Sequence, residues 1–98
     1  MESREQILKL LEKERDAIRR LGVNRLGLFG SFVRGEQKPD SDVDILVAME
    51  SNTFGAYVEV LDFLEDLFGR KVDLVPEEDI KPLLRNRILR EVVYVPNL

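Results

Sequence analysis

Three aspartates lie within or beside apolar, strand-like runs, and they constrain the fold of this chain more than any other feature. Asp42 and Asp44 open the run 43–49, and Asp73 lies inside the run 72–75. Strands disfavour aspartate, and a buried carboxylate must find a cation or shift its pKa. Residues two apart on a strand point the same way, so Asp42 and Asp44 would present their carboxylates on one face. The sequence therefore predicts a shared acidic site, which Asp73 completes from a neighbouring strand.

Divalent metal ions would explain why the three carboxylates occur together. The chain contains no cysteine and no histidine, and oxygen ligands without thiolate or imidazole favour Mg²⁺ or Mn²⁺ over zinc. Two such ions about 3.5–4 Å apart can activate an attacking oxygen and stabilise a leaving phosphate. Each motif also has a plainer interpretation. Asp42 could cap a turn, Asp44 could face solvent, and Asp73 could pair with Lys71 or Arg70 at the surface.

A Gly30-Ser31 pair stands upstream of the aspartates, with ten residues between Ser31 and Asp42. Glycine lets a backbone approach a phosphate, and the serine hydroxyl and the N–H groups of a following helical turn can donate to it. The alternative is an ordinary strand-to-helix turn with a serine cap. The segment is not a Walker A loop, because Glu36 stands where the phosphate-binding lysine should follow. Arg34 could reach a triphosphate or simply be solvated.

Hydrophobic periodicity and turn residues predict an α/β (α+β) fold. Helices are expected at about 3–21, with a capping box at its start, from 32, at 54–68 and within 77–90, and strands at 25–29, 43–49, 71–75 and 92–95. The run 92–95 could complete the sheet or pair with another chain, and we favour the sheet. The expected inward-facing residues are Ile7, Leu8, Leu11, Ile18, Leu21, Phe54, Val58, Leu61, Leu64, Leu67, Phe68, Leu84 and Ile88.

Length and charge limit the classes of function. At 98 residues, the chain is expected to form one domain, 1–98, that is too short to contain a separate substrate domain. No stretch approaches the ~18 apolar residues needed to span a membrane, and the N-terminus shows no secretory signal, so we expect a soluble cytoplasmic protein. The net charge of −4 argues against direct binding of nucleic acid, which depends mainly on a positive surface.

Two segments together resemble the minimal nucleotidyltransferase (MNT) proteins of the DNA polymerase β-like superfamily. They are Gly30-Ser31-Phe32-Val33-Arg34-Gly35 and Ser41-Asp42-Val43-Asp44-Ile45-Leu46-Val47. The resemblance covers nearly the whole chain, with mild departures at Phe32 and Val33, where tyrosine and alanine are usual. It implies the polymerase β-like fold, a small mixed β-sheet with helices packed on it.

The same resemblance implies roles for the site residues. Gly30 and Ser31, with Arg34, would bind the nucleotide. Asp42 and Asp44 would bind two Mg²⁺ ions. Asp73 would bind the catalytic ion and help to deprotonate the acceptor hydroxyl.

The resemblance also implies a partner. MNT proteins of this size are typically encoded beside a small HEPN-domain protein, often an RNase toxin, and act as its antitoxin. Similar antitoxins use ATP to AMPylate a tyrosine near the active site of the toxin. The chain is thus expected to be a Mg²⁺-dependent nucleotidyltransferase that transfers AMP from ATP to a HEPN toxin. Two alternatives stay open: a non-catalytic antitoxin that occludes its partner, and a small-molecule nucleotidyltransferase of the aminoglycoside-modifying kind.

Overall fold

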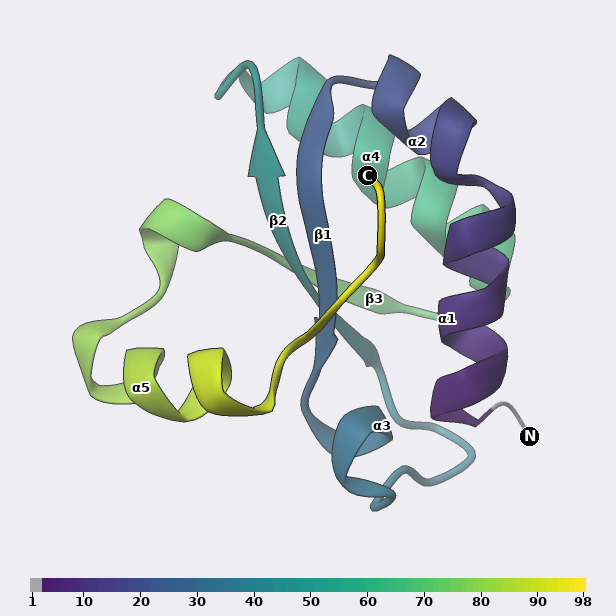
Figure 1. Cartoon of the computed structure of the whole chain (residues 1–98), viewed down its shortest axis with the longest axis vertical. Helices are drawn as coiled ribbons and strands as arrows, with labels where there is room; N and C mark the ends of the chain where they lie inside the picture. Colours follow the sequence, from purple (N-terminus) through teal and green to yellow (C-terminus); the bar gives the residue numbers. More distant parts are fainter. Residues whose placement is uncertain (1–2) are drawn as a thin grey trace.

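The structure is a computed structural model that describes residues 3–98, and it contains one mixed sheet with helices packed against it (Figure 1). In chain order the elements are α1 (Arg4–Lys13), α2 (Arg15–Arg20), β1 (Val23–Phe29), α3 (Ser31–Arg34), β2 (Val43–Met49), α4 (Phe54–Phe68), β3 (Val72–Pro76), the 3₁₀ turn η1 (Glu77–Asp79), α5 (Pro82–Glu91) and β4 (Val93–Tyr94). The strand order is β3-β2-β1-β4. β1 is antiparallel to β2 and β4, whereas β2 and β3 are parallel. The expected mixed sheet with helices on it is confirmed.

The first helix begins as predicted but is not continuous. The Ser3 hydroxyl accepts from the Gln6 N–H and the Gln6 side chain accepts from the Ser3 N–H, which confirms the capping box. The expected single helix 3–21 is wrong, because it divides into α1 and α2 at Glu14, where φ is −97° and ψ is 15°. The Ile18 N–H still donates to the Glu14 carbonyl, so the helix kinks rather than stops. The neighbouring residues 12–13 are exposed, and no packing there opposes the departure.

The main core lies between the sheet and the helices α1, α2 and α4, which cover one of its faces (Figure 1). The predicted inward positions Ile7, Leu11, Ile18, Leu64 and Phe68 are all buried there. The other inward positions on these helices, Leu8, Leu21, Leu61 and Leu67, are partly buried and pack against the same core, and Val58 is partly exposed. The sequence did not single out Val60, which is also buried.

Two positions that were expected to face inward do not. Phe54 is 81% exposed, because it is the first residue of α4, whose buried residues begin only at Val60. Leu84 is 44% exposed, because α5 contributes no fully buried residue to the fold. Ile88 does pack inward, as predicted, against a second cluster that contains Phe29, Leu46 and Ile80.

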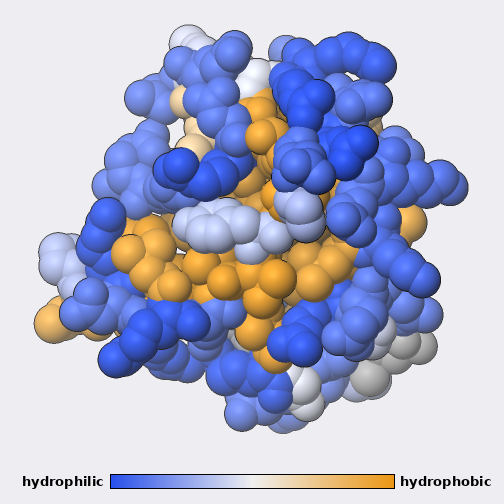
Figure 2. Space-filling model, viewed as in Figure 1, coloured by the Kyte–Doolittle hydropathy of each residue, from blue (hydrophilic) through white to orange (hydrophobic). Residues whose placement is uncertain are grey.

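The second face of the sheet is covered only in part, by α5 and by Ile80, which precedes it. In Figure 2 a band of hydrophobic surface extends from the side of α5 toward the middle of this face. β4 pairs with β1 through Gly27 and Leu28, so the run 92–95 completes the sheet, as favoured. A Cβ on Gly27 would lie 2.5 Å from the Val92 side chain, so glycine is required for this close approach. No helix within residues 3–98 has both the length and the apolar character needed to cross a membrane.

Candidate active site

Asp44 and Asp73 lie opposite one another on adjacent strands. β2 and β3 run parallel in a register that pairs these two residues. Val43 and Ile45 are buried in the main core, so alternation along the strand turns Asp44 to the other face of the sheet, where it is half-buried. Asp42 immediately precedes β2 and is exposed, as is Asp73. The fold therefore brings together the acids that the sequence predicted to meet.

The electrostatics of Asp44 show that these carboxylates interact. The pKa of Asp44 is raised to about 6, mainly by burial and in addition by the negative charges of Asp73 and Asp42. The positive charge of Arg34 lowers the pKa of Asp44 but does not cancel the increase. Like charges held this close without a matching cation are typical of a functional site rather than of a stabilising feature.

The turn after β1 places backbone directly against the Asp44 carboxylate. Gly30 has a φ of 80°, which L-residues rarely adopt, and a Cβ at this position would lie 2.0 Å from Oδ2 of Asp44. Phe29, the residue before it, pairs with Asp44 in the sheet. Ser31 then opens α3 and is partly exposed. Glycine and serine are thus adjacent to the acids, as the spacing predicted.

Arg34 is held by two carboxylates, one of which the sequence did not indicate. Its Nε donates to Glu36 at 2.9 Å, and its Nη1 lies 3.0 and 3.1 Å from the two carboxylate oxygens of Glu91. The Gly30 N–H also donates to Glu91, at 2.6 Å. Glu91 is the last residue of α5 and belongs to no motif, so only the tertiary fold reveals its position.

The loop that leads into Asp42 is fixed by Arg70, which follows α4. Its guanidinium donates to the carbonyls of Ser41 at 2.9 Å and Pro39 at 3.3 Å. The same group lies over the Phe32 ring, 5.3 Å from its centroid. Arg70 therefore connects the loop before the DxD pair to the short helix after Gly30.

The donor chemistry of the three aspartates fits divalent metal ions. They offer only carboxylate oxygens, which Mg²⁺ prefers, and a cation would relieve the mutual repulsion that raises the pKa of Asp44. In the present conformation, no group of three or more Asp, Glu, Cys or His residues among positions 3–98 is arranged closely enough to hold an ion. Mg²⁺ does not need three protein ligands, since it is usually held by one or two carboxylates together with substrate phosphates.

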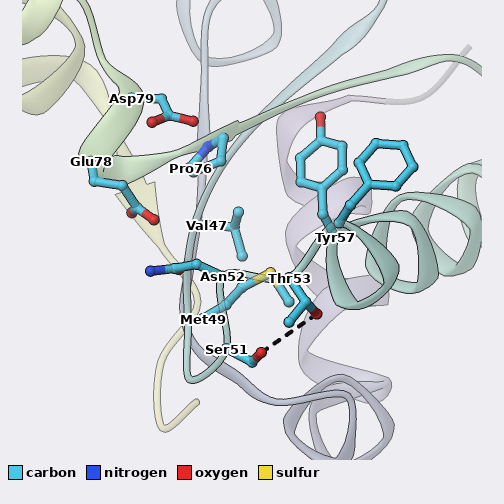
Figure 3. Close-up of a pocket in the computed structure, with 10 residues that line it drawn as sticks. Val47, Met49, Ser51, Asn52, Thr53, Tyr57, Pro76, Glu78 and Asp79 are labelled. Carbon is cyan, nitrogen blue, oxygen red and sulfur yellow. Dashed lines mark hydrogen bonds between the residues drawn. The ribbon is translucent and has the colours of Figure 1, made fainter.

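A separate pocket of about 560 Å³ lies elsewhere on the molecule (Figure 3). It is lined by Val47, Met49 and Pro76 at the carboxyl ends of β2 and β3, and by Tyr57 of α4. The aspartates lie near the amino ends of the same strands, so the pocket contains none of the predicted site residues. The Tyr57 hydroxyl donates to the Leu74 carbonyl at 2.7 Å, which gives this tyrosine a structural role.

The sequence of the chain matches the family model described as "Nucleotidyltransferase domain" over residues 8–95. The chain belongs to the nucleotidyltransferase family. A relative from Thermococcus cleftensis, named protein adenylyltransferase MntA, is 45% identical over 93 residues, which cover 93% of this chain and 94% of the relative.

Solved structures agree with this assignment. One described as a minimal nucleotidyltransferase has a TM-score of 0.71 and 40% identity, and the match covers 88% of this chain and 93% of that one. A mutant of the toxin–antitoxin complex MntA-HpeT has a TM-score of 0.66 and 27% identity, with coverage of 96% and 72%. The fold and the enzyme class implied by the Gly-Ser and DxD motifs are confirmed, and this nucleotidyltransferase is of the minimal kind.

Proposed function

We propose that this nucleotidyltransferase transfers AMP from ATP to a tyrosine hydroxyl of a HEPN-domain toxin and thereby acts as its antitoxin. The observation that carries the proposal is the register of β2 and β3, which sets Asp44 opposite Asp73 next to the Gly30 turn. The relative named protein adenylyltransferase and the structural likeness to a toxin–antitoxin complex support it.

The reaction assigns a distinct task to each element of the site. Asp42 and Asp44 would hold Mg²⁺ ions, with Asp73 as a further ligand, and the ions would supply positive charge to the transferring phosphate. Gly30 and Ser31 would position the triphosphate, with Arg34 beside them. The acceptor oxygen attacks the α-phosphorus, the bond between the α- and β-phosphates breaks, and pyrophosphate leaves. Asp73 is exposed, so it is accessible to an acceptor from solvent and can take the hydroxyl proton.

A partner protein would supply the acceptor, and α5 is the candidate surface for docking it. The helix exposes three large apolar side chains, Leu83, Leu84 and Leu89, with Leu83 96% exposed. Its last residue, Glu91, contacts the Gly30 turn. A protein that packs against α5 would therefore lie close to the Gly30 turn and could present a tyrosine there.

The test is an intact-mass spectrum of the HEPN protein encoded beside this chain, after incubation with the chain, Mg²⁺ and ATP. A gain of whole AMP units, mapped to tyrosine and absent with the Asp42→Asn variant, is the expected result. An unmodified mass together with a stable complex would replace the proposal with inhibition by occlusion. Transfer of labelled AMP to an aminoglycoside without any protein partner would replace it with a small-molecule activity.

A further inference from the structure

Glu91 makes the most unusual contact near the site. Its carboxylate accepts a hydrogen bond from the Gly30 N–H at 2.6 Å and lies 3.0 Å from Nη1 of Arg34. The Glu91 side chain is 16% exposed and the Arg34 side chain 33% exposed. Glu91 therefore adds a negative charge to the side of the sheet where the carboxylates of Asp44 and Asp73 already repel each other.

The two groups that bind Glu91 are the ones that a nucleotide would need. A backbone N–H in a glycine turn and an arginine guanidinium both recognise carboxylate and phosphate oxygens in the same way. The Gly30 N–H cannot donate a hydrogen bond to an oxygen of Glu91 and to an oxygen of a phosphate at the same time. Glu91 would also repel any phosphate that approached Arg34.

We propose that Glu91 is an internal competitor of the nucleotide phosphate. Its carboxylate occupies the anion position formed by Gly30 and Arg34, and a phosphate binds there only after Glu91 leaves. Glu91 thus lowers the affinity for nucleotide, and it acts as a positioning residue for Arg34 in the empty protein. The inference rests on the proposed function, since it concerns the same triphosphate.

Release of Glu91 would also affect α5. Glu91 ends this helix, no residue of α5 is fully buried, and Ile88 is its main apolar contact with the rest of the protein. Few packing interactions therefore oppose a shift of the helix end. Nucleotide binding would loosen the helix whose exposed leucines form the candidate docking surface.

The test compares the parent with Glu91→Gln and a matched control, Glu36→Gln. Both glutamates form ion pairs with the Arg34 guanidinium, but the Glu36 side chain is 64% exposed, and only Glu91 accepts a hydrogen bond from the Gly30 N–H. Isothermal titration calorimetry with Mg²⁺ and α,β-methylene ATP measures binding without AMP transfer, because carbon replaces the bridging oxygen that would be cleaved. Thermal unfolding without nucleotide is measured on the same samples.

Glu91→Gln is expected to bind the analogue about 3- to 10-fold more tightly than the parent, and Glu36→Gln to bind it like the parent. Without nucleotide, Glu91→Gln should unfold at a lower temperature, because its charge-assisted bonds are weakened. A merely structural residue would lose stability and affinity together. Equal or weaker binding by Glu91→Gln, or equal tightening by both variants, would overturn the inference. Absence of binding by every chain would remove the proposed function, and this inference with it.

Discussion

Asp44 of β2 and Asp73 of β3 lie directly opposite each other on adjacent parallel strands. A slip of this register by one residue would turn one of them away, because the side chains of a strand alternate between faces. The pairing places two like charges side by side, and burial with this repulsion raises the pKa of Asp44 to about 6. The arrangement therefore costs stability in the absence of a cation.

Asp44→Asn is expected to stabilise the metal-free protein while abolishing AMP transfer. The folded-state pKa of about 6 lies above the ordinary value of 3.8, so the parent loses stability as the pH rises through this interval. Asp44 is only half-buried, and solvent screening reduces the full linkage energy to about 1 kcal/mol at pH 7.5. Urea unfolding in EDTA measures the difference, which should disappear near pH 4. Asp62→Asn, at an exposed position on α4, is the control, and an Asp44→Asn variant less stable than the parent at pH 7.5 would refute the expectation.

Gly30→Ala is expected to destabilise the protein more than Gly35→Ala. Both glycines have positive φ values, 80° and 72°, and each substitution costs about 1 kcal/mol in backbone strain. Only at Gly30 would the new Cβ meet the Asp44 carboxylate, at 2.0 Å, whereas Gly35 has no atom within 4 Å. We expect an extra loss of about 1–3 kcal/mol at Gly30, measured by chemical denaturation, together with loss of transfer activity. Equal losses at the two positions would show that the contact with Asp44 is unimportant.

Arg70→Lys is expected to loosen the loop before Asp42. Lysine keeps the positive charge but lacks the planar group that binds two carbonyls and covers the Phe32 ring. A stability loss of about 1 kcal/mol should accompany a transfer rate lower by about tenfold, because misplaced ligands slow a reaction that depends on positioning. Lys71→Ala, at the neighbouring exposed position, should change neither. Unchanged activity in Arg70→Lys would show that this loop needs no fixed geometry.

The ion pair of Arg25 with Glu77 should contribute stability that depends on pH. The hydrogen bond from Arg25 is the main cause that lowers the pKa of Glu77, so this stability is present at neutral pH and is lost as the pH falls through the folded-state pKa. Glu77→Gln should cost about 0.5–1 kcal/mol at pH 7, because Arg25 is 59% exposed, and less at pH 3. Urea unfolding at both pH values tests this. Glu5→Gln, in the pair with Arg4 whose carboxylate side chain is 71% exposed, should have no measurable effect at either pH. A loss at Glu77 that is as large at pH 3 as at pH 7 would point to packing instead of charge.

The sequence by itself determined most of the local elements and the family of the protein. Ser3 and Gln6 specify a helix start through their own hydrogen bonds, and the alternation of Val43, Asp44 and Ile45 assigns faces to a strand, because both effects act within a few residues. The spacing of Gly30-Ser31 from the DxD pair also identified the family, which the comparison confirmed.

Only the tertiary structure decided which distant residues meet. The register of β2 and β3 sets Asp73 opposite Asp44, and the docking of α5 brings Glu91 to Gly30, although no local pattern encodes either contact. The exposure of Phe54 and Leu84 was mispredicted for the same reason, since helical periodicity assigns a face but does not say how far the sheet beneath it extends. Long-range pairing and the extent of each packed layer depend on the whole chain, and they determine the partners of each functional side chain.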